Sequence, residues 1–119
     1  KRMTHWRSVV VSACEQSGRA SIPGLAQPLG LAQGAAAIAE DCMKLTLDLL
    51  GEDSLASLHA PASRRVAVAI GPEGGWSPRD RETLRQAGFG GLRLGPRILR
   101  TETAGLAAIA ALQSRFGDL

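Results

Sequence analysis

The chain has 119 residues, of which 45% are hydrophobic and 14 are Lys or Arg against 11 Asp or Glu, giving a net charge of +3. This length suits one domain with its own core. No apolar run reaches the roughly 20 residues of a membrane span, and no secretory signal pattern is found, so we expect a cytoplasmic protein.

Cysteine and histidine form no metal or catalytic pattern. Cys14 and Cys42 belong to no CxxC pair, and His5 and His59 lack ligand spacing. We expect two free thiols and no metal site.

The first half of the chain predicts two helices and a strand. Thr4 is a candidate N-cap for a helix that ends at Gly18. Its apolar face, at helical spacing, is Trp6, Val9, Val10, Ala13 and Cys14. A proline-containing loop leads to a short helix in "LAQGAAAIAED", and alternation in "MKLTLDLL" predicts a strand over residues 44–49. The segment "GEDSLASLHAPAS" is interpreted as a surface connection.

The second half predicts strand, helix, strand, helix. Residues 64–70 form a strand that is apolar on both faces, as in a parallel sheet. Ser77 and Pro78 predict a helix start, with Asp80 completing a capping-box-like pair and Gly88 as the stop. "GGLRLG" predicts a strand over residues 91–94. The alternation indicates an α/β fold with a mainly parallel sheet.

The last predicted helix covers residues 102–116. Its expected apolar face is Leu106, Ile109, Leu112 and Phe116. Most other positions are Ala or Gly, which permits a second helix to approach closely.

Two glycine-rich loops follow consecutive predicted strands, "IGPEGGW" at residues 70–76 and "LGPRILRTET" at 94–103. Ligands of open α/β sheets bind outside the carboxyl ends of the strands. Glycine exposes the backbone there, and Pro72 and Pro96 stiffen the loops. The loops therefore predict two sides of one pocket; the alternative is a pair of tight turns that need glycine only for positive φ.

Several common site types are disfavoured. Neither loop is a GxGxxG fingerprint or a P-loop, which argues against a small Rossmann-like oxidoreductase and against P-loop nucleotide binding. No Ser or Cys lies in a nucleophile elbow.

Residues 69–113, "AIGPEGGWSPRDRETLRQAGFGGLRLGPRILRTETAGLAAIAALQ", resemble the C-terminal half of the RsmE family. "EQSGR" at residues 15–19 resembles the "QSGR" stretch that begins this family's catalytic domain. The resemblance implies that residues 1–119 form a SPOUT-type domain, with helices on both faces of a mainly parallel sheet and a C-terminal trefoil knot. The family's N-terminal PUA-like RNA-binding barrel has no counterpart in this sequence.

The family methylates N3 of a uridine in 16S ribosomal RNA with S-adenosylmethionine. The resemblance therefore implies an S-adenosylmethionine-dependent ribosomal RNA methyltransferase that acts as a homodimer on the small subunit. A non-catalytic SPOUT-like module that binds a nucleotide or RNA is the alternative.

The resemblance also implies site residues. Donor-binding residues would be Ile70, Gly71, Pro72, Glu73, Gly74, Gly75, Leu94, Gly95, Ile98, Leu99, Thr101, Thr103 and Ala104. Catalytic residues would be Arg97 and Arg100, which favour the uridine anion, and Glu102, which accepts a hydrogen bond. Arg19 and Arg97 would contact RNA.

Some of these residues have structural alternatives. Glu102 is favourable in the first turn of any helix, and Arg19 can satisfy carbonyls at a helix end. Trp76 is either a lid or part of the core. A further set of arginines forms a solvated face or touches RNA: Arg64, Arg65, Arg79, Arg81 and Arg85.

Overall fold

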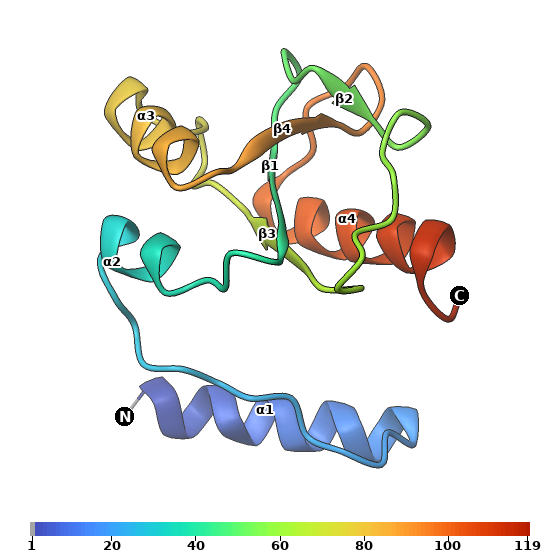
Figure 1. Ribbon diagram of the computed structural model, residues 1–119. Coiled ribbons are helices and arrows are strands. Elements are labelled where there is room, and N and C mark those ends of the chain that lie inside the picture. The colour runs from blue at the N-terminus through green and yellow to red at the C-terminus, as the bar shows by residue number, and fades with distance from the viewer. Residues whose placement is uncertain (1) are drawn as a thin grey trace.

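A four-stranded parallel sheet organises the computed structural model, which describes residues 2–119 (Figure 1). The strand order is β2-β4-β1-β3, and β1 pairs with both β3 and β4. The strands are β1 (Met43–Leu47), β2 (Asp53–Ser54), β3 (Val66–Ala69) and β4 (Gly90–Arg93). The predicted α/β fold with a mainly parallel sheet is confirmed.

The three predicted strands are present, with ends that differ from the predicted ones. β1 stops at Leu47 because Asp48 forms a turn, in which its Oδ1 accepts a hydrogen bond from the Leu50 N–H at 2.9 Å. β3 starts at Val66 rather than at residue 64, since Arg64 has a positive φ of 59° that no strand accommodates. β4 covers Gly90–Arg93, one residue earlier than predicted.

The segment after β1 is more than the predicted surface connection. β2 pairs in parallel with β4, and Leu58 is only 5% exposed. This pairing depends on Gly51, because a Cβ atom there would lie 2.5 Å from the carbonyl carbon of Gly91. The prediction was wrong because a contact between two glycine backbones leaves no hydrophobic pattern in the sequence.

The main core lies between the sheet and α4 (Thr101–Phe116). Its buried members are Leu45, Leu58, Leu92 and Leu112. Leu112 and the partly buried Phe116 confirm half of the predicted face of α4, but Leu106 and Ile109 are 74% and 58% exposed. The other buried residues of α4 are Ala104 and Ala108. A spacing of four residues places these alanines on the side of Leu112, and their small size lets the helix pack closely.

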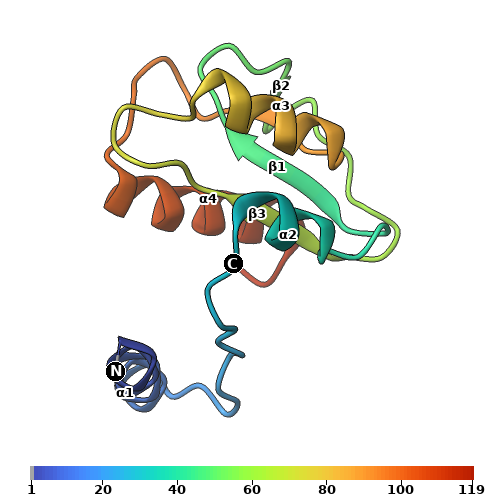
Figure 2. The same ribbon diagram turned by 90° about the vertical axis from the view of Figure 1, so that its left-hand side faces the viewer.

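α3 (Pro78–Gln86) begins and ends as predicted. The Ser77 hydroxyl accepts a hydrogen bond from the Asp80 N–H at 3.1 Å, and Gly88 has a φ of +96°. The buried Lys44 donates from Nζ to the carbonyl oxygen of Ala87 at 3.0 Å, placing a positive charge at the helix C-terminus. The short α2 (Leu31–Ala36), predicted in the Ala-rich segment, lies beside α3 (Figure 2).

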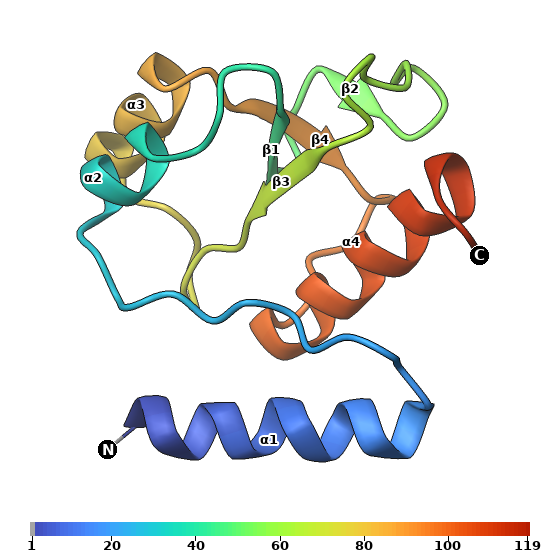
Figure 3. The ribbon, with the colours of Figure 1, turned by 60° about the horizontal axis from the view of Figure 1, so that its bottom comes forward.

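α1 (Arg2–Ser17) lies apart from the sheet and is joined to it by an extended segment (Figure 3). Thr4 lies inside this helix, so the predicted N-cap is wrong. A cap stabilises a helix start by only about 1 kcal/mol. Because no helix-breaking Pro or Gly lies between Arg2 and Thr4, the helix can extend past Thr4 toward the N-terminus. Gly18 ends the helix as predicted, with a φ of +74°. Of the predicted apolar face only Cys14 is buried, whereas Trp6 is 40% exposed. No helix of residues 2–119 has both the length and the apolar character to span a bilayer.

Candidate functional site

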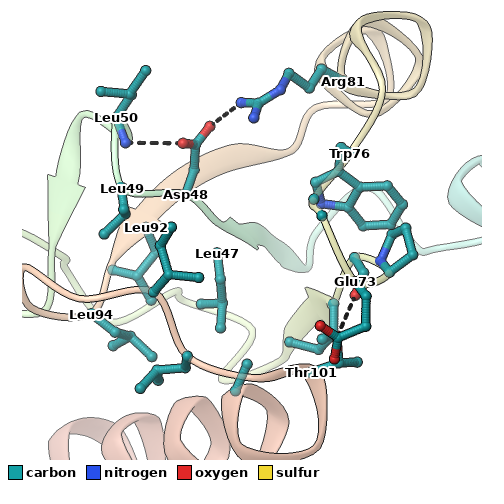
Figure 4. Close-up of a pocket in the computed structure, with 18 of the residues that line it drawn as sticks. Leu47, Asp48, Leu49, Leu50, Glu73, Trp76, Arg81, Leu92, Leu94 and Thr101 are labelled. Atoms are coloured by element: carbon teal, nitrogen blue, oxygen red, sulfur yellow. Dashed lines mark hydrogen bonds and ion pairs between the residues drawn. The ribbon is translucent and has the colours of Figure 1, made fainter.

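A pocket of about 430 Å³ opens at the carboxyl ends of β1, β3 and β4 (Figure 4). Both glycine-rich loops line it, together with the first turn of α4 and the segment after β1. The two loops therefore share one pocket, as the sequence predicted. They leave β3 and β4, which flank β1, so the end of β1 lies between them.

Most of the predicted donor-binding residues line this pocket. Those that do are Ile70, Gly71, Pro72, Glu73, Gly74, Gly75, Leu94, Ile98, Leu99, Thr101 and Ala104. Gly95 and Thr103 are outside the lining. Gly95 has a φ of +76°, which explains the glycine by backbone conformation alone.

The first loop is a tight turn that also forms a pocket wall. The Gly75 N–H donates to the carbonyl oxygen of Pro72 at 2.9 Å, and Gly74 within that turn has a φ of +86°. A Cβ atom on Gly74 would meet no atom within 4 Å, so the space beside its backbone is open. The two interpretations of these glycines are thus compatible. The tight turn requires glycine for its positive φ, and the same glycines leave backbone exposed at the pocket wall.

Trp76 is a wall of the pocket. Its indole covers Gly71, where a Cβ atom would lie 3.1 Å from Cε2 and 3.2 Å from Nε1 of the ring. The Nε1 atom is buried and has no hydrogen-bond partner within residues 2–119. An unpaired buried donor is unfavourable by about 1–3 kcal/mol.

One wall of the pocket was not predicted from the sequence. It consists of Leu47, Asp48, Leu49 and Leu50, with Leu92 and Arg81 beside them. Arg81 is exposed, as expected of a solvated face, but its Nη1 also pairs with Oδ2 of Asp48 at 2.6 Å. Asp48 lies inside the strand that was predicted over residues 44–49, so the sequence carried no local signal of its place at the pocket. The remaining arginines of that set, Arg64, Arg65, Arg79 and Arg85, are exposed and outside this pocket.

The predicted catalytic and RNA-binding residues are dispersed. Arg97 lines the pocket with an exposed side chain. Arg100 is the N-cap residue of α4 and Glu102 lies in its first turn; both are exposed and outside the lining. Arg19 is also outside the lining and donates from Nε to the carbonyl oxygen of Ser21 at 2.8 Å. The structure thus brings only Arg97 of these four to the pocket.

Metal-ligating residues do not gather around this pocket or elsewhere in the described residues 2–119: no three of His, Cys, Asp or Glu come together there. Cys14 and Cys42 are free thiols, the first buried and the second partly buried.

Comparison with known proteins identifies the class. The RNA methyltransferase domain family matches residues 1–113, and the chain belongs to this family. The ribosomal RNA small subunit methyltransferase E of Buchnera aphidicola subsp. Schizaphis graminum is 40% identical over all of this chain and 48% of its own length. The enzyme of the same name from Mycobacterium bovis is 34% identical over 98% of this chain and 47% of its own length. The resemblance to the RsmE family is confirmed.

Two solved structures are similar throughout. The ribosomal RNA small subunit methyltransferase E of Neisseria gonorrhoeae, bound to S-adenosyl methionine, has a TM-score of 0.93 and 38% identity over 99% of this chain and 49% of that chain. A putative methyltransferase of Legionella pneumophila, in complex with the same cofactor, has a TM-score of 0.91 and 40% identity over 99% of this chain and 48% of that chain. The chain therefore spans about half the length of the relatives it matches.

Proposed function

We propose that the chain is the methyltransferase domain, residues 1–119, of an enzyme that transfers a methyl group from S-adenosylmethionine to small-subunit ribosomal RNA. The observation that carries this proposal is the convergence of both glycine-rich loops on one pocket at the carboxyl ends of the strands. Membership of the RNA methyltransferase domain family supports it independently.

The pocket fits the donor in size and in chemistry. Its volume of about 430 Å³ falls within the roughly 300–1,000 Å³ of small-molecule sites. Leucines supply apolar walls, and Gly71, Gly74 and Gly75 present bare backbone to a ligand. The residues that would hold the donor are these glycines and the other predicted ones that line the pocket: Ile70, Pro72, Glu73, Leu94, Ile98, Leu99, Thr101 and Ala104. The bound donor supplies an electrophilic methyl group.

We propose N3 of a uridine as the methyl acceptor. This nitrogen must lose a proton before it attacks, so the site must favour the uridine anion. Arg97 is the cation best placed for this role, because it lines the pocket and carries no ion-pair partner within residues 2–119. Arg100 and Glu102 would contact the nucleotide from the start of α4, and Arg19 would contact RNA phosphate.

The remaining SPOUT features are proposed for the fold: helices on both faces of the sheet and a trefoil knot made by residues 70–75, residues 94–103 and α4. Two contacts support the knot. Thr101 Oγ1 lies 3.4 Å from the Gly71 carbonyl oxygen, and a Cβ atom on Gly105 would lie 3.9 Å from Cγ1 of Ile70. The first turns of α4 are thus adjacent to the first loop.

We also propose a cytoplasmic homodimer. Leu106 and Ile109 give α4 an apolar side on which they are 74% and 58% exposed, and the exposed Ala110 lies one turn after Leu106. Large exposed apolar surfaces favour association. Leu106→Glu should convert the dimer into a monomer in light-scattering measurements.

The proposed function is tested in two stages. Isothermal titration should detect binding of S-adenosylmethionine and S-adenosylhomocysteine, and a radiolabelled donor should then transfer its methyl group to unmodified small-subunit RNA. No donor binding would contradict the proposal. Donor binding with no transfer to RNA would favour the non-catalytic binding module.

A further inference from the structure

The ion pair of Asp48 and Arg81 lies at the wall of the pocket that follows β1 (Figure 4). Oδ2 of Asp48 lies 2.6 Å from Nη1 of Arg81, and Oδ1 accepts from the Leu50 N–H at 2.9 Å. The Asp48 side chain is only 22% exposed. A second ion pair in the protein, Arg65 with Asp41, is longer at 3.4 Å and about 60% exposed on both sides. The Asp48 pair is therefore the more enclosed of the two.

The backbone holds Asp48 rigidly at this position. Its N–H donates to the carbonyl oxygen of Leu92 at 2.9 Å, and its carbonyl oxygen accepts from the Gly51 N–H at 3.0 Å. A Cβ atom on Gly91 would lie 2.8 Å from Cα of Gly51 and 3.4 Å from Cβ of Asp48. Two glycines thus bring this turn against β4, which fixes the carboxylate at the pocket.

The carboxylate retains free hydrogen-bonding capacity. A carboxylate has about four lone-pair sites, and the contacts to Arg81 and Leu50 occupy two of them. Arg81 already compensates the negative charge and would repel a second cation. Neutral hydroxyl groups therefore match the remaining capacity better than an ammonium group does.

We propose that Asp48 is a donor-recognition residue whose carboxylate accepts hydrogen bonds from the ribose hydroxyls of the methyl donor, and that Arg81 is the residue that positions it. This inference rests on the proposed function, because it takes the pocket as the donor site. In this arrangement the pocket wall that follows β1 binds the ribose of the donor.

The test compares S-adenosylhomocysteine with its 2′,3′-dideoxy analogue by titration calorimetry. The intact protein should bind the dideoxy analogue roughly 10- to 100-fold more weakly, as expected for loss of hydrogen bonds to a charged acceptor. Asp48→Asn should weaken binding of S-adenosylhomocysteine by a similar factor. It should leave binding of the dideoxy analogue nearly unchanged, because that analogue has no ribose hydroxyls to donate to residue 48. The Asn side-chain oxygen can still accept from Leu50, so the turn is retained.

Further variants distinguish a role of Arg81 in positioning the Asp48 carboxylate from a general effect of ion pairs on protein stability. Arg81→Met should weaken S-adenosylhomocysteine binding several-fold, and Arg81→Lys should restore part of it. Asp41→Asn, which removes the exposed ion pair, should change binding less than twofold.

The assignment would be overturned if the intact protein bound both ligands equally, or if Asp48→Asn weakened both to the same extent. Failure of the intact protein to bind S-adenosylhomocysteine at all would instead overturn the proposed function, and the assignment with it.

Discussion

The side-chain hydroxyl of Thr101 donates a hydrogen bond of 3.4 Å to the backbone carbonyl oxygen of Gly71. This contact joins the first turn of α4 to the loop that leaves β3, two segments thirty positions apart in the chain. It therefore links the two sides of the pocket directly.

Thr101→Val should weaken donor binding by roughly 2- to 10-fold, because it removes one neutral hydrogen bond between the loops while keeping the side-chain volume. Titration with S-adenosylhomocysteine measures the change. Thr101→Ser, which keeps the hydroxyl, should bind within about twofold of the unmodified protein. Unchanged affinity in Thr101→Val together with weakening in Thr101→Ser would show that the methyl group of Thr101, and not the hydrogen bond, supports the pocket.

Gly71→Ala should displace the indole of Trp76, since the added Cβ atom would lie 3.1 Å from the ring. We expect a shift in tryptophan emission and weaker donor binding, measured in a Trp6→Phe background that leaves Trp76 as the only tryptophan. Gly24→Ala is the matched control, because a Cβ atom there meets nothing within 4 Å. Unchanged emission in Gly71→Ala would contradict the close contact between the loop and the ring.

Gly51→Ala should lower the free energy of unfolding by about 3 kcal/mol, because its Cβ atom would overlap the backbone of Gly91 at 2.5 Å. Backbone atoms of a paired strand cannot move aside as a flexible side chain can. Chemical denaturation measures the loss, and Gly30→Ala, where the Cβ atom has open space, provides the control. A loss below about 1 kcal/mol would mean that β2 is not held against β4 in this way.

Arg97 and Arg100 should differ in their effects. Arg97→Ala should reduce methyl transfer and also change donor affinity, since Arg97 lines the pocket. Arg100→Ala should reduce methyl transfer while donor affinity stays within about twofold, because its side chain is outside the lining. Transfer rates with RNA and titrations with the donor separate the two. Full transfer activity in Arg100→Ala would remove this residue from the proposed mechanism.

Features that depend on neighbouring residues in the chain were predictable. Ser77 and Pro78 started a helix and Gly88 ended it, because caps and stops act over a few residues. The two loops were found for a similar reason: their glycines and prolines constrain the backbone wherever they occur. Their meeting in one pocket followed from the rule that ligands bind at the carboxyl ends of parallel strands.

Features set by strand order and backbone contacts were not predictable. β1 precedes both loops in the chain but lies between their strands in the sheet, so Asp48 reaches the pocket without any local signal of it. The face of α4 was half wrong because Ala104 and Ala108, rather than the larger Leu106 and Ile109, pack inward. Hydrophobicity alone favours the larger residues, whereas the close approach of the helix selects the smaller ones.

A crystal structure of the protein with S-adenosylhomocysteine tests the donor pocket most directly. We predict ligand density between residues 70–76 and residues 94–101, in contact with the backbone of Gly71 and Gly74. Density confined instead to a second pocket in the protein, which residues including Val66 and Ile109 line, would contradict the account.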